Sequence, residues 1–173
     1  MSLKGKKIII LAENFYQELE LWYPRLRMME EGAEVKIVAP EKGKTYTSRH
    51  GNPVESDLSS AEVKIEEVDA VIIPGGFAPD LLRRDPKMVE MVKRAYQQKK
   101  IIAAICHAGW LLISAGIVKG KKLTSFFSIK DDMINAGANW VDKEVVVDGN
   151  LITSRKPDDL PAFCKKIIQT LKG

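Results

Sequence analysis

Short apolar runs alternate with longer amphipathic stretches along this chain. Buried strands are predicted where apolar, mostly β-branched residues follow one another, at residues 7–12, 34–40, 68–73 and Ile101–Ile105. Helices are predicted where apolar residues recur at helical spacing, at residues 19–31, 86–99, 107–115, 129–136 and 158–171. This alternation indicates an α/β protein with a doubly wound, mostly parallel sheet that binds ligands at the carboxyl ends of its strands.

Weaker signals complete the pattern. Residues 44–58 predict two short strands, and residues 123–125 predict another. Strands at residues 144–148 and Leu151–Ser154 flank Gly149 and Asn150, a pair typical of a tight hairpin. Pro24 lies inside the pattern of the first helix, so we expect it either in the first turn or at a kink.

Composition limits the classes of protein that fit. The 173 residues, 45% of them hydrophobic and 29% charged, predict one globular domain over residues 1–173. The first three residues resemble a cloning remnant and are left out of the fold prediction. The net charge is +4, but Lys and Arg are scattered and not interleaved with aromatic residues, which argues against a nucleic-acid partner.

The sequence also argues against a membrane, a disulfide framework and a bound metal. The first apolar run, at residues 8–12, is far shorter than the roughly 20 residues of a membrane helix, so no membrane partner is expected. Two cysteines without CxxC spacing, Cys106 and Cys164, favour free thiols in a reducing cytoplasm. Two distant histidines and no ligand cluster argue against a metal, and no cofactor is predicted.

The most informative segment is AICHAG at residues 104–109, where an apolar strand runs directly into a helix. Cys106 stands at this junction with small residues around it, a pattern typical of a nucleophile elbow. The helix amino terminus would lower the pKa of the thiol and offer amides to an oxyanion. The alternative, a buried core cysteine, stays open.

The histidines restrict the mechanism. His107 is either a general base or counterion for Cys106, or a helix-capping residue, and His50 is expected to be structural. No histidine follows residue 107, which disfavours the hydrolase and amidotransferase triads that need a later one. Cys164, in the closing helix, is expected in the core.

Two further groups are placed by the predicted strand ends. Gly75 and Gly76 follow a strand expected beside that of Cys106, so they either approach a ligand closely, with a backbone N–H directed at it, or form an ordinary turn. Glu13, Glu18 and Glu20 follow the first strand. One of these acids could meet the thiol and share its proton, with a raised pKa, or all three are solvated.

Several segments together resemble the ThiJ/PfpI superfamily. They are residues 18–24, 73–76 and 104–109, and residues 129–137, 145–149 and 153–157, which look especially like its PfpI branch. The resemblance covers nearly the whole chain. It implies a flavodoxin-like sandwich of a sheet between helices, and a homo-oligomer, either a homodimer or a hexamer.

The resemblance also implies roles for single residues. Cys106 matches the nucleophile, Glu20 the acid that hydrogen-bonds the thiol, and Gly76 and the His107 amide the oxyanion donors. Asp80 matches the acid that completes the histidine site from a neighbouring subunit. Members of the family with peptidase activity carry Glu there, so the shorter Asp80 weakens that expectation, and Trp110 is bulkier than expected and narrows the pocket.

Three activities are associated with similar proteins: intracellular peptidase, glutathione-independent glyoxalase and deglycase. In each the thiolate of Cys106 adds to a carbonyl, and Glu20 or His107 moves the proton. We expect a cysteine-dependent hydrolase or lyase that acts on small carbonyls, glycated amines or, secondarily, peptides. The alternative is a redox-responsive or chaperone-like stress protein that senses oxidation at Cys106.

Overall fold

A computed structural model describes residues 2–173 and shows a seven-stranded sheet in the order β10-β11-β7-β6-β1-β2-β5. All neighbouring strands are parallel except the hairpin of β10 and β11. The strands are β1 (Lys7–Leu11), β2 (Glu34–Ala39), β5 (Leu58–Ser59), β6 (Ala70–Ile73), β7 (Ile101–Ile105), β10 (Val145–Asp148) and β11 (Leu151–Ser154). The predicted α/β, flavodoxin-like fold is confirmed.

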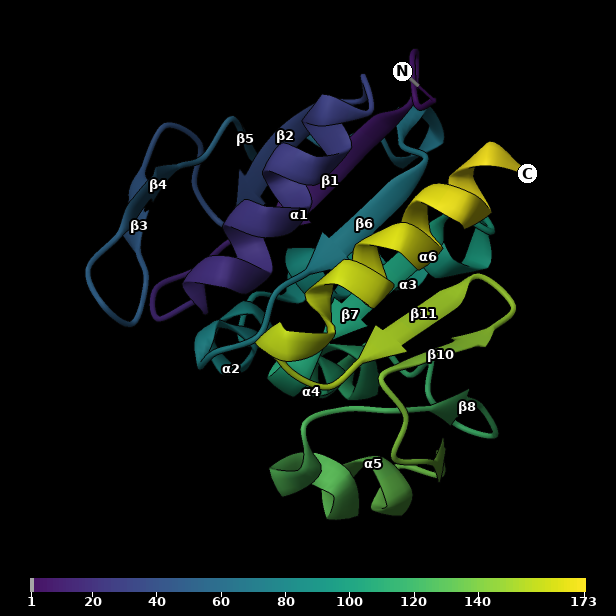
Figure 1. The fold of residues 1–173 in the computed structure, drawn as a ribbon. Helices are drawn as coiled ribbons and strands as arrows, with labels where there is room; N and C mark the ends of the chain where they lie inside the picture. Colours follow the sequence, from purple (N-terminus) through teal and green to yellow (C-terminus); the bar gives the residue numbers. More distant parts are fainter. Residues whose placement is uncertain (1) are drawn as a thin grey trace.

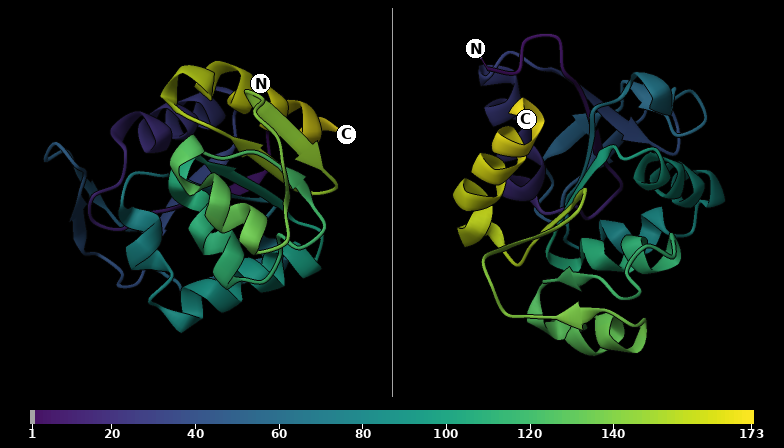
Figure 2. Two further views of the ribbon diagram at one scale, coloured as in Figure 1. Left: turned by 90° about the horizontal axis from the view of Figure 1, so that it is seen from below. Right: turned by 90° about the vertical axis from the view of Figure 1, so that its right-hand side faces the viewer.

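Helices cover both faces of the sheet (Figures 1 and 2). On one face lie α1 (Glu18–Glu30) and α6 (Leu160–Lys172), and on the other α2 (Ala78–Leu82), α3 (Pro86–Gln97) and α4 (Gly109–Ser114). α5 (Lys130–Asn135) lies beyond the carboxyl ends of the strands, next to a small pair of strands, β8 (Lys122–Leu123) and β9 (Asn139–Trp140). Among residues 2–173, no helix is both long and apolar enough to cross a membrane.

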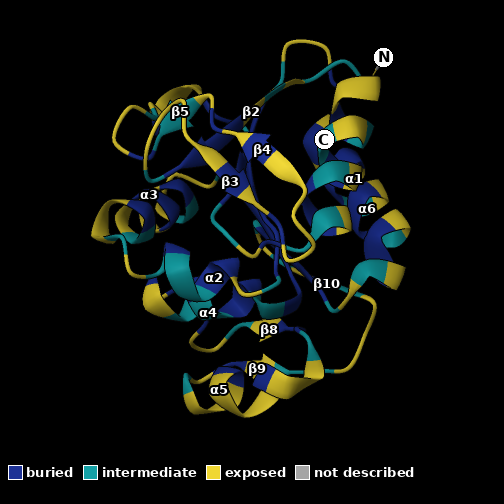
Figure 3. Ribbon diagram, turned by 90° about the vertical axis from the view of Figure 1, so that its left-hand side faces the viewer, coloured by how far each residue is buried: buried dark blue, intermediate teal, exposed yellow. Residues whose placement is uncertain are grey.

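Each face of the sheet has its own hydrophobic core, and buried residues line the layers between sheet and helices (Figure 3). Alternate residues of β1 face opposite cores, with Ile8 and Ile10 toward α1 and α6 and Ile9 and Leu11 toward α3 and α4. β6 and β7 are buried along their whole length, as expected for central parallel strands.

Most predicted elements are confirmed, and two local expectations were wrong. Pro24 lies in the middle of α1 and not in its first turn, and the helix continues past it to Glu30 although proline cannot donate to the carbonyl of Glu20. The kink, the other expectation for Pro24, stays a prediction. Leu3, which the fold prediction left out, is fully buried, and its N–H donates to the Glu31 carbonyl at 2.8 Å. The helix expected at residues 107–115 begins as a 3-10 turn over Cys106–Ala108 and becomes α-helical only at Gly109.

The remaining elements depart from the expected pattern in small ways. Residues 44–58 contain the two expected short strands, β3 (Thr45–Thr47) and β4 (Pro53–Glu55), which pair with each other in antiparallel fashion. α2 was not predicted, because five residues are too few to show a helical period. The carboxyl ends of β1, β6, β7 and β11 converge where α2, α4 and the start of α6 meet (Figure 1), and this is the place where an α/β sheet binds ligands.

Candidate active site

Cys106 stands on a strained turn directly after β7. Its φ is +62°, in the left-handed region that non-glycine residues rarely adopt, whereas Ile105 before it is extended. A conformation of this kind costs about 1–3 kcal/mol and is held by the surrounding structure. One such contact is the N–H of Phe126, which donates to the Cys106 carbonyl at 3.2 Å. The geometry is that of the expected nucleophile elbow.

Glu20 is the acid that meets Cys106. It lies in the first turn of α1, where the Gln17 side chain accepts a hydrogen bond from the Glu20 N–H at 2.9 Å and caps the helix. The carboxyl group is fully buried and accepts the N–H of Gly75 at 2.7 Å. Burial raises the pKa of Glu20 to about 7, although the hydrogen bond from the Gly75 N–H and, after it, the neighbouring Cys106 thiol lower it.

Opposing effects act on the pKa of the Cys106 thiol. Burial first, and then the charge of the Glu20 carboxylate, raise the pKa of the Cys106 thiol, while the amides of Gly76 and His107 lower it. The sequence-based prediction that the helix terminus lowers the pKa of this thiol was therefore wrong, because the prediction left out the burial of Cys106 and the charge of Glu20. When Glu20 takes up a proton its repulsion disappears, so the two groups share one proton and titrate as a pair.

Gly75 makes the approach of these groups sterically possible. A Cβ atom on Gly75 would lie 2.6 Å from the Cys106 Cβ and 2.6 Å from Glu20 Oε2. Its N–H is taken by the Glu20 carboxyl group, so Gly75 positions the acid, whereas the amides of Gly76 and His107 face the sulfur. Gly76 needs its own φ of +77°, with the Phe15 carbonyl too close to admit a side chain.

Replacing Gly75 by alanine is expected to separate the pair. The added methyl must displace both Cys106 and Glu20, and a shift of about 1 Å costs on the order of 10²-fold in rate. We expect a loss of that size in the alkylation rate of Cys106 by iodoacetamide and in any turnover. Gly43→Ala is the control: its Cβ would meet nothing within 4 Å, but its φ of +70° strains an alanine, so both variants are compared per folded molecule. An unchanged alkylation rate in Gly75→Ala would contradict this role.

His107 contacts the sulfur directly. Its Nδ1 lies 3.2 Å from Cys106 Sγ and its Nε2 lies 3.0 Å from the Ser128 hydroxyl. The ring stacks on Phe126, with centroids 5.1 Å apart, and meets Trp110 edge-on at 5.0 Å. Burial lowers the pKa of His107, and the nearby Asp132 carboxylate raises it by less. The neutral imidazole is therefore favoured at neutral pH, as a proton acceptor requires.

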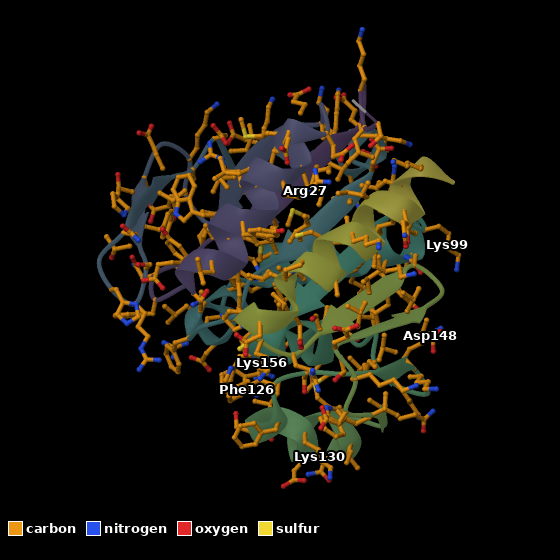
Figure 4. The ribbon with its side chains drawn as sticks, viewed as in Figure 1. Arg27, Lys99, Phe126, Lys130, Asp148 and Lys156 are labelled. Carbon is orange, nitrogen blue, oxygen red and sulfur yellow. The ribbon has the colours of Figure 1, made fainter. Side chains whose placement is uncertain are left out.

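A pocket of about 690 Å³ opens in front of the sulfur. Its volume falls in the usual range for sites that bind small molecules. Figure 4 labels Phe126 in the lower part of the molecule, above Lys130 of α5. The indole of Trp110 donates to Asp132 of α5 at 2.8 Å and is held as one wall. The wall is largely aromatic, with a few polar groups: Phe15, Gln17, Glu20, Arg49, Gly76, Phe77, Cys106, His107, Trp110, Phe126 and Pro157.

The other predicted acids lie apart from the sulfur contacts. Glu18 accepts hydrogen bonds from the Ser48 hydroxyl and the His50 backbone and lies 3.0 Å from the His50 ring. Burial raises the pKa of Glu18, but these hydrogen bonds outweigh it and hold the value at about 2. Glu13 accepts the N–H of Asn14. Of the three acids after β1, only Glu20 meets the thiol.

Two further residues considered in the sequence lie in helices, Asp80 in α2 and Cys164 in α6. Asp80, in α2, forms an ion pair with Arg84 one turn later. Cys164 is buried in α6, and burial raises its pKa to about 12 although Arg27 lowers it. Among residues 2–173, no group of three or more His, Cys, Asp or Glu side chains is placed to hold a metal ion.

Phe126 and Ser128 contact His107 but were not predicted from the sequence, and neither were the other lining residues Phe15, Gln17, Arg49, Phe77 and Pro157. Phe126 and Ser128 follow β8 and reach His107 only because residues 124–129 fold back over the elbow. Residue 109 must also be glycine because of this packing: a Cβ atom there would lie 2.6 Å from the sulfur of Met133 in α5. No local signal marks contacts of this kind, which depend on how α5 packs.

Together, the fold and the site define an α/β protein with a cysteine at a strand-to-helix elbow, paired with a buried acid. A model of the DJ-1/PfpI family matches residues 6–170. The chain belongs to the DJ-1/PfpI family, which confirms the resemblance found in the sequence.

Individual relatives are similar over most of this chain. Deglycase PfpI of Pyrococcus furiosus is 47% identical, over 96% of this chain and 99% of its own length. General stress protein 18 of Bacillus subtilis is 42% identical, over 97% and 99%. The crystal structure of an Anabaena variabilis protein with DJ-1/ThiJ/PfpI-like and ferritin-like domains superposes with a TM-score of 0.94 at 40% identity. That match covers 96% of this chain and 48% of the two-domain protein.

Proposed function

We propose that this protein is a cysteine-dependent deglycase that acts on adducts of small α-oxoaldehydes with amines. The observation that carries the proposal is the Cys106 sulfur, which faces an aromatic pocket and has Glu20, His107 and the Gly76 amide around it. A pocket of about 690 Å³ suits a small adduct better than a folded protein chain. The name of the Pyrococcus furiosus relative supports the same reaction class.

The reaction follows from this arrangement. In an adduct of methylglyoxal with an amine, the Cys106 sulfur attacks the carbon that carries nitrogen and hydroxyl. The C–N bond breaks as the C–S bond forms, and the amine leaves with a proton from His107 or Glu20. The resulting hemithioacetal moves its carbon-bound hydrogen to the adjacent carbonyl carbon through an enediol. This gives a thioester of lactate, which water hydrolyses to lactate and free thiol.

The chain's own groups hold the intermediates. The Gly76 and His107 amides, which face the sulfur, are proposed to bind the oxygen that becomes negative during attack and hydrolysis. Glu20, with a pKa of about 7, is suited to give and take a proton at neutral pH. Free methylglyoxal enters the same route at the hemithioacetal, so glyoxalase activity is expected as well.

The test is release of amine and lactate from methylglyoxal-treated N-acetyl-lysine. Since such adducts also revert spontaneously, amine release is compared with that caused by a thiol scavenger that removes free methylglyoxal at the same rate. Release faster than with the scavenger is the expected result. Amine release no faster than with the scavenger would show that the protein acts only on free methylglyoxal, as a glyoxalase. The absence of lactate would contradict the proposal altogether.

The redox interpretation is the second candidate. It is favoured by the carboxyl group of Glu20 beside the sulfur, which could hydrogen-bond a Cys106 sulfinate, and by the name of General stress protein 18. Under mild peroxide a sensor would stop at the Cys106 sulfinate and show no turnover. The peptidase activity, an oligomer in which Asp80 reaches His107 of a neighbour, and a cytoplasmic location all stay predictions.

A further inference from the structure

The His107 ring is held at both of its nitrogens by groups of its own chain. Nδ1 lies 3.2 Å from Cys106 Sγ, and Nε2 lies 3.0 Å from Ser128 Oγ. A neutral imidazole carries a proton on only one nitrogen, and the partner of that nitrogen selects which one. If the Ser128 hydroxyl accepts a hydrogen bond from Nε2–H, Nδ1 is unprotonated and can accept the thiol proton; if the hydroxyl donates to Nε2, Nδ1 carries the proton and cannot.

Ser128 is fixed in place although its side chain is exposed. It lies in the 3-10 turn Phe127–Ile129. On one side the Phe126 N–H donates to the Cys106 carbonyl at 3.2 Å, and on the other the buried Ile129 donates its N–H to the Phe126 carbonyl at 3.2 Å. The hydroxyl is thus tied to the same elbow that carries the nucleophile.

The ring plane is fixed as well. Phe126 stacks on His107 with an interplanar angle of 29°, and Trp110 meets its edge at 67°. The charged or titratable groups that face the ring are Cys106 and, from α5, Asp132, whose carboxylate accepts the Trp110 indole N–H. Among the described residues, Ser128 Oγ is the group at hydrogen-bond distance from Nε2, at 3.0 Å, so it is the group of the same chain that can orient the ring.

We propose that Ser128 is a positioning residue that accepts the Nε2–H of His107 and so directs the Nδ1 lone pair at the Cys106 thiol. The proposal rests on the proposed function, since it concerns the same nucleophile. The thiol proton moves to Nδ1 as sulfur attacks, Nε2–H stays bonded to the hydroxyl, and Nδ1 later returns its proton to the leaving amine. In this proposal the neutral Ser128, and not the predicted Asp80 of a neighbouring subunit, takes the place that an acid has in other cysteine–histidine sites.

The structure offers a matched set of variants. Ser128→Ala removes the acceptor, Ser128→Thr keeps a hydroxyl, and Ser114→Ala removes an exposed serine at the end of α4 whose hydroxyl bonds Arg83. Imidazole ¹⁵N–¹H spectra report the tautomer directly. Since the chain has only one other histidine, His50, the His50→Gln variant assigns the signals.

We expect the wild type and Ser128→Thr to show Nε2–H, and Ser128→Ala to show a mixture of tautomers. The pH at which His107 titrates is expected to fall in Ser128→Ala, because an acceptor that stabilises the imidazolium is gone. The pH profile of Cys106 alkylation by iodoacetamide then moves with it, and kcat falls about 10-fold with KM nearly unchanged. Ser114→Ala should match the wild type.

A Ser128→Ala protein with the wild-type ring spectrum and alkylation profile would overturn the proposal. Neither measurement needs a substrate, so both remain decisive even if no adduct is turned over. Cys106-dependent deglycation with full activity in Ser128→Ala would leave the proposed function standing and refute the role of Ser128 alone.

Discussion

Replacing Cys106 by serine is expected to reduce turnover of carbonyl adducts by about 10³-fold or more, because a hydroxyl is a far weaker nucleophile than a thiolate. The substitution changes only one atom at a position that is 8% exposed, so the free energy of unfolding should change by about 1 kcal/mol or less. Steady-state rates and urea unfolding measure the two effects separately.

The other cysteine provides the control. Cys164 is buried in the core between α6 and the sheet, so Cys164→Ser places a hydroxyl in apolar surroundings and costs about 1–3 kcal/mol of stability. Its turnover per folded molecule should equal that of the wild type. Cys106→Ser retaining more than a small fraction of the activity would show that the sulfur at the elbow is not the nucleophile.

The second large effect is a change in stability with pH that depends on Glu20. Its pKa of about 7 in the folded protein lies above the ordinary value of 4.5, so the folded chain keeps a proton that the unfolded chain releases between these values. The free energy of unfolding therefore falls as pH rises through this range, by about 3 kcal/mol. In Glu20→Gln, which preserves the shape, this contribution is absent.

The measurement is urea unfolding of both proteins from pH 4.5 to pH 8. The stability of Glu20→Gln relative to the wild type should rise by about 3 kcal/mol across this range, while its turnover falls because the proton shared with sulfur is lost. Glu67→Gln is a control: the Lys7 ammonium lowers the pKa of Glu67, so what this carboxylate contributes to stability is lost only below pH 4.5 and its curve should run nearly parallel to that of the wild type from pH 4.5 to pH 8. Parallel curves for Glu20→Gln and the wild type would contradict the buried acid.

The sequence predicts the layers of this fold well and its site in part, for a physical reason. β1, β6 and β7 are recognisable because strands buried on both faces must be apolar throughout. The elbow at Cys106 is recognisable because the end of a strand and the start of a helix are both local patterns. β9 and α2 carry no such mark, since β9 exists through its pairing with β8.

The details of the site depend on tertiary packing, which local patterns do not contain. Three acids follow β1, and only the way α1 lies over the turn after β6 selects Glu20. The contact of Ser128 with His107 depends on how residues 124–129 return to the elbow. The raised pKa of the thiol also depends on burial, which the position of Cys106 next to a helix did not reveal.

The central claim is that the Cys106 sulfur forms a covalent bond with the carbonyl substrate. Mass spectrometry of the protein, quenched with acid during turnover of methylglyoxal and digested, tests it most directly. The account predicts a mass increase of one methylglyoxal on the peptide that contains Cys106, and none on the peptide that contains Cys164. Lactate formation without any adduct on Cys106, or with the adduct on Cys164, would contradict it.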